Sequence, residues 1–455
     1  GDPTNWFIDP VSRNTWPSTT HSFKIGHQPK DNNLNDIKYV WEVGRFIHLA
    51  DVIRYLFLSK DRNIKCKTIH QIQSFEDRNF MYSGIHWISE QEVAIRTLFF
   101  TRLLFVLRTL KLLNTDDTLL LMRQIFAGAM FCFKENNYAK HCIGNNHFLA
   151  GGIAMYMTAV AFPWHKHAKK WKFKGRDHII KSLDQWNKDG GYIQPSHNYH
   201  RLALNYLLYA KLFSNAENDQ NLEQKITKTI KISENFLYEF MELDNGFLPN
   251  WGPNDGSQIC CWTKCNYDDF RPVIKASQIL VDGASPINSG SHDEYLFWMG
   301  NSFDRENKFS PRSQSSVKIF NNTGLLSIRS PNTKLSAFCR LGPIYSRYGQ
   351  QSDLHHFDLF YNGKNILLDA GSFCYGLPDY HDWFRSSNAH NTASINGHDQ
   401  FKKFSKFLYV FWPKSTKCIK TPKNKDILFE IEVIHNGFKE ISSNITHKRN
   451  VRLHR

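Results

Sequence analysis

The sequence predicts an α+β chain with two domains, a helical domain over residues 1–309 and an antiparallel β-sandwich over residues 310–455. Three observations lead to this prediction. Apolar residues recur with a helical period from about residue 36 to about residue 300. The period becomes two from about residue 310 onward. The chain has 455 residues, which is more than a single hydrophobic core usually serves, so two domains are expected.

The helical period is carried by segments that follow one another closely. The expected helices are a long one from residue 36, one with the opposite-charge pair Glu92 and Arg96, and segments 98–113, 148–162, 202–213 and 226–241. Leu202, Tyr206 and Tyr209 fall at i, i+4 and i+7, so they form one apolar stripe of their helix. Segment 148–162 is rich in Gly and Ala, which permits close contact between helices. This succession of helices predicts a toroid or a solenoid.

In the second part of the chain, apolar and polar residues alternate. Every second residue from Ile427 to Val433 is apolar, which predicts a strand with one buried face. Shorter apolar runs at 325–328, 366–368 and 408–412 lie between turn residues and predict further strands. Residues 310–322 are the expected linker between the two domains. An antiparallel sandwich is therefore expected to follow the helices.

The composition favours an anionic partner. The formal charge is +15 and the isoelectric point is about 9.3, which would suit a nucleic acid, a membrane surface or an acidic sugar. Aromatic residues make up 14% of the chain, with 12 Trp and 35 Phe. Aromatic rings suit stacking on sugars, although ordinary core packing explains most of them. Some of the Trp residues are expected to line a cleft.

Several signals are missing from the sequence. The chain as given has no run of 18 apolar residues and no signal peptide, so no transmembrane segment is predicted. Periplasmic and cytoplasmic locations in a bacterium both stay open, as does the oligomeric state. The nine Cys residues include no Cys-x-x-Cys pair, which argues against a zinc knuckle or a disulfide framework.

Three polar clusters interrupt the apolar pattern. They are residues 144–147, residues 194–201, and a set in the sandwich at 349–358, 368–372 and 385–392. In the second cluster Tyr199 lies between His197 and His200, just before the helix expected from Leu202, and a phenol beside imidazoles can give and take protons. A helix-capping turn whose Tyr packs like any other is the alternative. Such loops from both domains are best explained by a shared cleft, which the turn-rich loop around Trp251 could cover.

A set of motifs runs through nearly the whole chain in a consistent order. They are Trp6 to Pro10, Asp36 to Phe46, Asn145-Asn146-His147, Phe162-Pro163, Asp189-Gly190-Gly191, His197 to His200 and Phe384 to Thr392. Together they resemble the motifs of the heparinase II/III-type polysaccharide lyases and the related alginate lyases. The resemblance implies an incomplete (α/α) toroid joined to an antiparallel β-sandwich. It also implies an anionic polysaccharide or oligosaccharide in the groove between them.

The resemblance implies roles for individual residues. Asn146 matches the residue that neutralises the uronate carboxylate, and His147 matches its neighbour in the site. Tyr199 matches the acid, which in many members is also the base, and His390 matches a site histidine of the sandwich. The expected substrate contacts are Asn145, His200, Arg45, Arg96, Gln351, His355 and Trp251.

The chain departs from the family pattern at the sandwich. Many members carry a His-x-His-x-Asp run there, and Gly349 and Gln351 stand at its two histidine positions. Asp369 and His390 remain as weak candidates for metal ligands, but closed zinc sites use four ligands. No cofactor is therefore predicted. A structural zinc or calcium ion would lack a ligand unless His355 or His356 supplied it, and at most one of these two neighbours on a strand can face the cleft. We interpret the chain as a divergent branch of the family.

The predicted function is β-elimination on a uronate-containing polysaccharide. Donors on the uronate carboxylate make the C5 proton acidic, and an acid and a base within hydrogen-bond reach complete the reaction. Two alternatives stay open: a catalytically altered glycan-binding or capsule/O-antigen-assembly protein on the same fold, and a glycoside hydrolase. The hydrolase needs two facing carboxylates, for which Glu92 and Asp255 are candidates without a motif. Nucleic-acid binding explains the charge alone and is not predicted.

Overall fold

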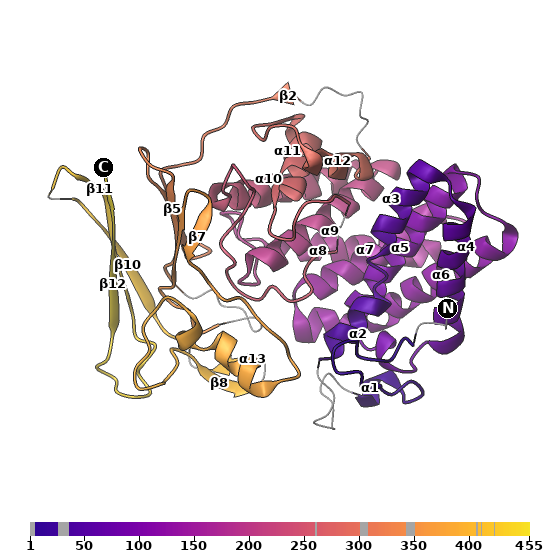
Figure 1. Ribbon diagram of the computed structural model, residues 1–455, viewed down its shortest axis with the longest axis horizontal. Coiled ribbons are helices and arrows are strands. Elements are labelled where there is room, and N and C mark those ends of the chain that lie inside the picture. Colours follow the sequence, from indigo (N-terminus) through magenta and orange to yellow (C-terminus); the bar gives the residue numbers. More distant parts are fainter. Residues whose placement is uncertain are drawn as a thin grey trace.

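A computed structural model of the chain describes residues 5–25, 36–259, 262–300, 308–342, 351–405, 408–410, 412–422 and 424–455. The described residues form a helical part followed by antiparallel sheets, which confirms the predicted fold class. Figure 1 shows the helices gathered on one side of the molecule and the sheets on the other. Among the described helices, none is long and apolar enough to cross a membrane.

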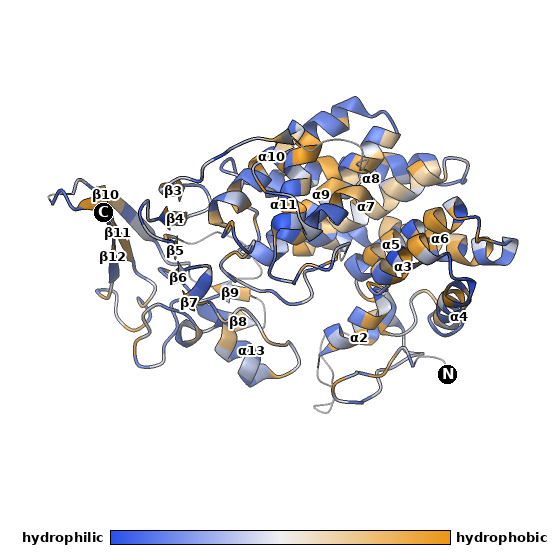
Figure 2. Ribbon diagram, turned by 45° about the horizontal axis from the view of Figure 1, so that its top comes forward, coloured by the Kyte–Doolittle hydropathy of each residue, from blue (hydrophilic) through white to orange (hydrophobic). Residues whose placement is uncertain are grey.

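Long helices make up most of the first part. They are α2 (Ile37–Gly44), α3 (Leu49–Ser59), α4 (Arg62–Arg78), α5 (Glu90–Thr109), α6 (Thr115–Tyr138), α7 (Asn146–Ala161), α8 (Ala168–Ser182), α9 (His197–Ala216), α10 (Gln220–Phe240) and α11 (Arg271–Asp282), with the short α1 (Ser22–Ile25) and α12 (Glu294–Trp298). Hydrophobic residues concentrate on α5, α7 and α9 in the middle of this part (Figure 2). A Cβ on Gly175 of α8 would lie 2.7 Å from the carbonyl oxygen of Gly152 in α7, so the expected close helix contact is present.

The helix boundaries differ from the prediction at two places. The long helix expected from residue 36 is broken, because α2 ends at Gly44 and α3 begins at Leu49. Between them Phe46 has a φ of 60° and is fully buried against Trp6 and other rings, so core packing of this side chain turns the chain. Conversely, the two helices expected around residues 92–96 and 98–113 form the single helix α5.

The sheets of the second part match the predicted alternation. One sheet has the antiparallel order β3 (Val317–Phe320), β4 (Leu325–Arg329), β5 (Leu335–Arg340), β6 (Phe357–Tyr361) and β7 (Lys364–Leu367). A second sheet has the order β10 (Ser415–Lys420), β11 (Ile427–His435) and β12 (His447–His454). Two smaller pairs are the antiparallel β8 (Lys402–Ser405) and β9 (Leu408–Val410), and the parallel β1 (Ala284–Ser285) and β2 (Lys308–Phe309). The predicted linker 310–322 contains β3, so it is not wholly a connecting loop.

The two larger sheets pack face to face, and polar contacts anchor the sandwich to the helices. Leu326 and Cys339 of the first sheet share a core with Ile431 and Val451 of the second. The carboxylate of Asp189, in the predicted Asp-Gly-Gly turn, accepts hydrogen bonds from the backbone at 322 and 323, at 2.7 and 3.0 Å. Side chains from both parts can therefore meet at their junction.

Candidate active site

A cavity of about 190 Å³ lies where the helical part meets the sandwich. Five residues predicted for the site line it: Arg45, Asn145, Asn146, His147 and Tyr199. The sandwich contributes Tyr375 and Arg385 to the same wall. The shared cleft expected from polar loops of both parts is therefore present, although the sandwich supplies a phenol and a guanidinium to it rather than His390.

The local structure of α9 places Tyr199. The helix begins at His197, five residues before the predicted start at Leu202, because the Ser196 hydroxyl accepts a hydrogen bond from the Tyr199 backbone N–H at 3.1 Å and caps the first turn. The Tyr199 hydroxyl lies 3.2 Å from the carbonyl oxygen and 3.3 Å from the carboxylate Oδ2 of Asp255. The Lys38 ammonium lies 3.3 Å from the same hydroxyl. This phenol is therefore held between a carboxylate and a cation.

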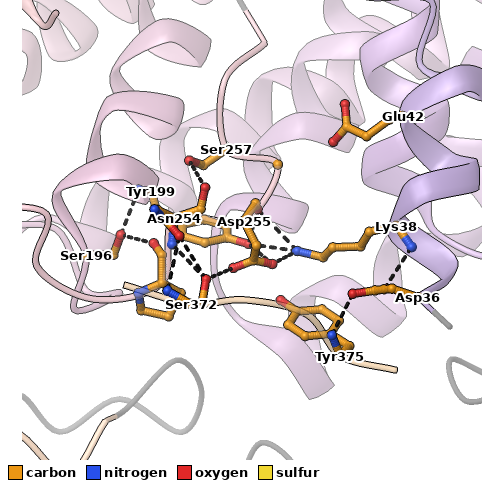
Figure 3. Close-up of polar contacts among 12 residues, drawn as sticks. Asp36, Lys38, Glu42, Ser196, Tyr199, Asn254, Asp255, Ser257, Ser372 and Tyr375 are labelled. Atoms are coloured by element: carbon orange, nitrogen blue, oxygen red, sulfur yellow. Dashed lines mark hydrogen bonds and ion pairs between the residues drawn. The ribbon is translucent and has the colours of Figure 1, made fainter. Parts of the chain in front are cut away.

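Figure 3 shows how Lys38 reaches this phenol. Asp36 caps α2 by accepting from the Lys38 backbone N–H at 3.0 Å, and its other oxygen accepts from the Tyr375 N–H at 2.6 Å. The Lys38 side chain forms an ion pair with Asp255 and lies 4.2 Å above the Tyr375 ring. Burial, followed by the neighbouring Tyr199, raises the pKa of Tyr375 well above its ordinary value, so this hydroxyl stays protonated.

Asn146 and His147 occupy the first turn of α7. Asn145 caps this helix by accepting from the His147 backbone N–H at 3.2 Å. The amide nitrogen of Asn146 donates to the Gln91 side chain, while its oxygen has no hydrogen-bond partner among the described residues. The His147 imidazole lies 3.1 Å from Glu90 and is 23% exposed. His147 therefore presents an accessible imidazole to the cavity, while Asn146 lies buried in its wall.

Arg45 is tied to two carboxylates. Its guanidinium pairs with Glu42 and in a bidentate manner with Glu92, and it donates to the Gly256 carbonyl at 2.8 Å. Burial alone would lower the pKa of Arg45, but Glu42 and Glu92 outweigh burial and raise it. Burial would likewise raise the pKa of Glu92, but the charge of Arg45 and its hydrogen bonds outweigh burial and lower it. This pair stays ionised at the cavity wall.

The two imidazoles beside Tyr199 face the core and not the cavity, contrary to the interpretation of a phenol between two working imidazoles. His197 lies 2.9 Å from the Pro249 carbonyl oxygen, and His200 lies 2.7 Å from the Ser233 hydroxyl. Burial lowers the pKa of His197 to about 4 and the pKa of His200 well below its ordinary value. Successive helical residues are turned by about 100°, so neighbours of a cavity residue point elsewhere.

His390 belongs to a second polar cluster, inside the sandwich, which does not line the cavity. Its Nε2 lies 3.3 Å from the Gln351 side-chain oxygen and 3.6 Å from Asp369. Burial lowers the pKa of His390 to about 4, and burial raises the pKa of Asp369 to about 6. Asp353 completes this cluster, since its ligand atom lies within 4.8 Å of those of Asp369 and His390.

The donor set of this second cluster fits a metal ion only in part. Arg340 forms a buried ion pair with Asp353, and the Trp251 indole donates to the other Asp353 oxygen at 2.9 Å. Asp353 is therefore already balanced. The ring nitrogens of His390 lie 2.7 Å from the Ser386 carbonyl oxygen and 3.3 Å from the Gln351 side-chain oxygen, so His390 could bind a metal ion only by giving up one of these contacts. Gly349 lies outside the described residues.

The remaining predicted contacts lie away from the cavity. Arg96 donates to the His86 carbonyl at 2.7 Å and packs against the Trp87 ring at 4.6 Å, and burial lowers its pKa to about 9. Trp251 is buried against His197, with ring centroids 5.3 Å apart. His355 is buried beside two other histidines. Among the described residues, Trp41 is the tryptophan that lines the cavity.

Several residues at the cavity were not predicted from the sequence. Lys38, Gln91, Gln194 and Tyr375 line the cavity but were not assigned to the site, and Glu92 and Asp255 were considered only for a hydrolase. Lys38 follows the helix cap Asp36 by two residues, which is the one local signal that could have identified it. Tyr375 comes from a loop of the sandwich whose approach to α2 is decided by the tertiary structure.

Two family models match the chain. The model described as Heparinase II/III N-terminus matches residues 11–273, and the model described as Heparinase II/III-like, C-terminal, matches residues 312–455. Two curated relatives are heparin-sulfate lyases. The protein from Bacteroides stercoris is 24% identical over 278 residues, and the protein from Bacteroides thetaiotaomicron is 23% identical over 279 residues. Each match covers 57% of this chain, which spans 38% of each relative's length.

Solved structures share the fold. The crystal structure of a heparinase III has a TM-score of 0.64 at 16% identity and covers 99% of this chain and 66% of that chain. A heparan sulfate lyase from Pedobacter heparinus has a TM-score of 0.54 at 18% identity and covers 100% of this chain and 63% of that chain. These likenesses confirm an α/α toroid followed by a β-sandwich.

Proposed function

The chain belongs to the heparinase II/III family, and from this premise we propose that it is a polysaccharide lyase that cleaves an acidic, uronate-containing polysaccharide by β-elimination. The observation that carries the proposal is the convergence of Asn146, His147 and Tyr199 on one cavity. These side chains come from two helices, and a β-elimination needs donors on a carboxylate and a proton-transfer group on the same sugar.

In the proposed reaction, Asn146 and His147 bind the uronate carboxylate. The oxygen and nitrogen of an amide are exchanged by a flip that leaves the heavy atoms in place. If both Asn146 and Gln91 are flipped, Gln91 donates to Asn146, and the Asn146 amide nitrogen takes the position that has no partner among the described residues, where it would be available to the carboxylate. The hydrogen bonds would strengthen as charge develops on the carboxylate during removal of the C5 proton.

Tyr199 is the proposed acid and base. As a phenolate it would take the C5 proton, and as a phenol it would return a proton to the leaving glycosidic oxygen. The Lys38 ammonium at 3.3 Å would offset the negative charge of the phenolate form. Asp255 would hold Lys38 in place through their ion pair.

A glycoside hydrolase on this cavity is the weaker candidate. Its general acid needs a carboxyl group with a raised pKa. The pKa of Glu92 is lowered by Arg45 despite burial, and Asp255 is paired with Lys38. Neither carboxylate is therefore set up to protonate a leaving group.

An exposed aromatic group beside the cavity supports a polysaccharide ligand. On α13 (Pro378–Arg385), Tyr380 is 55% and Trp383 is 50% exposed, and Phe373 packs on Tyr380 with centroids 5.3 Å apart. Arg385 at the end of the same helix lines the cavity. Aromatic faces suit sugar rings, so further sugar units would extend along α13.

Incubation with a panel of uronate glycans tests the proposal. Heparan sulfate comes first, because the curated relatives are heparin-sulfate lyases, followed by other sulfated and unsulfated uronate polymers. The expected result is a growing ultraviolet absorbance from the unsaturated uronate product. New reducing ends without this absorbance would instead identify a hydrolase. Retention on a glycan column without any cleavage would identify a binding protein. This candidate is favoured by Gln351, which stands at a position where many members of the family have a histidine.

A further inference from the structure

Another hollow lies where the helical part meets the sandwich, apart from the cavity. Its volume is about 520 Å³, and it shares no lining residue with the cavity. The helical part contributes the Lys188–Asp189 turn and one face of α10, and the sandwich contributes β3 and the turn that follows it. We call it the α10–β3 hollow. Its size and its position at a domain interface are typical of small-molecule sites, which have volumes of about 300–1,000 Å³.

Polar contacts fix the walls of the α10–β3 hollow. The Asp189 carboxylate accepts hydrogen bonds from the backbone at 322 and 323, which holds the turn after β3 against the helical part. Arg312 forms an ion pair at 3.2 Å with Glu234, which is 1% exposed. The hollow is therefore formed before a ligand binds, and a preformed site lowers the cost of binding.

The side chains that remain available offer both hydrogen-bond donors and acceptors. Among the described residues, the amides of Asn235, Asn321 and Asn322 make no side-chain hydrogen bond. The ammonium groups of Lys188 and Lys318 likewise have no ion-pair partner in the described part of the chain. Each amide can donate and accept, so a ligand that does both can be bound from several sides.

The charges of the lining cancel. Lys188 and Lys318 are balanced by the carboxylates of Asp189 and Glu239, and the charge of Arg312 is balanced by its partner Glu234. An anion in the hollow would be repelled by the carboxylates, and a cation would be repelled by the ammonium groups. A polar ligand without net charge therefore fits this lining best.

We propose that the α10–β3 hollow binds an uncharged sugar unit of a polysaccharide. Sugar hydroxyls donate and accept, as the amides do, and the nonpolar face of a sugar ring would lie on Ile232 and Ile319, which are half-buried in the lining. A neighbouring hollow of about 190 Å³ shares Asn321 and Asn322 with it, so a chain of sugars can continue there. The choice of a sugar over a peptide, which also donates and accepts, rests on the proposed function.

The test measures binding to the whole protein by saturation-transfer NMR. The uncharged probes are cellotetraose, maltotetraose and the tetramer of N-acetylglucosamine, and a uronate tetrasaccharide and a capped tetraalanine peptide are the competing probes. We expect at least one uncharged sugar to bind. Asn235→Trp should weaken its binding by at least about tenfold, because the indole occupies the hollow and an amide partner is lost. Gln224→Trp is the matched control and should bind like the wild type, because Gln224 is exposed on the same helix.

A second variant protects the test against a failure of Asn235→Trp to fold. Lys318→Leu changes an exposed side chain of β3 and should weaken binding by about twofold to tenfold. The melting temperature of each variant shows that it is folded. Asn235→Trp should also keep the rate of uronate elimination on a short oligosaccharide, since Asn235 does not line the cavity.

Three outcomes would overturn the proposal. They are no binding of any uncharged sugar, binding that neither variant weakens, and tighter binding of the peptide or of the uronate tetrasaccharide that Asn235→Trp abolishes. The absence of an unsaturated product would refute the proposed lyase activity instead, because the NMR measurement does not depend on cleavage.

Discussion

The cavity and the cluster around His390 use similar residue types but differ in what can reach them. The cavity lies at the junction of the two parts of the chain, and its His147 imidazole is 23% exposed. The side chains of His390 and Asp369 are 0% exposed, and Arg340 already balances the charge of Asp353. The comparison teaches that a motif residue contributes to chemistry only where its side chain meets the substrate, and otherwise contributes to stability.

The largest expected effect is at the phenol of the cavity. Tyr199→Phe should lower the rate of uronate elimination by about 10²–10⁴-fold, because it removes the proposed acid and base. The ring keeps its packing, so the melting temperature should stay within a few degrees. Tyr295→Phe is the matched control, since its hydroxyl is buried in the helical part and donates to Asn205 at 2.5 Å. Full activity of Tyr199→Phe on a confirmed substrate would refute the mechanism.

A smaller effect is expected at the cation beside that phenol. Lys38→Met should lower the rate by about tenfold to a hundredfold. Removing a donor that contacts the reacting charge itself typically lowers the rate by about 10²–10³-fold, and Lys38 contacts the phenol instead. It should also lower the melting temperature, because Asp255 is left unpaired. The double variant with Asp255→Asn should recover stability but not rate. Removal of the exposed pair Lys334–Asp244 should change neither. Recovery of the rate in the double variant would exclude a role for the ammonium.

The buried histidines of the helical part should make the protein sensitive to acid. Burial lowers the pKa of His86 to about 3, and the pKa of His178 and His197 to about 4. Between pH 6.5 and about 4, each of these histidines binds more protons in the unfolded chain than in the folded protein. As the pH falls through this range, each histidine therefore lowers the free energy of unfolding by about 1.4 kcal/mol per pH unit. Glu234, whose pKa burial raises to about 7, contributes the opposite sign.

In the sandwich, burial raises the pKa of Asp358 to about 7 and of Asp369 to about 6, but it lowers the pKa of His356 and His390 to about 4 and of His435 to about 3. Histidines with a lowered pKa outnumber carboxyl groups with a raised pKa in both parts, so the net effect of acid is expected to be destabilising. Urea unfolding at pH 7, 5.5 and 4.5 measures it, and the midpoint should fall with pH. A midpoint that rises on acidification would show that these imidazoles are not buried in their neutral form.

The smallest effect on the rate is expected at His390. His390→Gln should lower the elimination rate by less than about tenfold, because its imidazole is buried away from the cavity, while its melting temperature should fall. His147→Gln provides the comparison and should lose more activity with less change in stability. If His390→Gln instead matches Tyr199→Phe in activity and keeps its stability, His390 is catalytic as the sequence resemblance implied.

Much of the architecture could be predicted from the sequence because it depends on local periodicity. The helical period of α7, α9 and α10 and the alternation in β11 are properties of neighbouring residues. The break at Phe46 was not predicted, because burial of its ring against residues distant in the chain decides it. The early start of α9 was missed although its cap, Ser196, is a local signal. Asn146, His147 and Tyr199 were found through motif order, and the structure places all three at one cavity.

The sequence by itself determined which elements form and which polar motifs they carry, because both follow from residues close together in the chain. Only the tertiary structure decided which of those motifs share a surface. Lys38 and Asp255 are 217 residues apart and Lys38 and Tyr199 are 161 apart, yet they meet. His390 is hidden instead, and three histidines gather between the sheets. Such meetings depend on how helices and sheets pack, which is fixed by burial summed over the whole fold and not by any single segment.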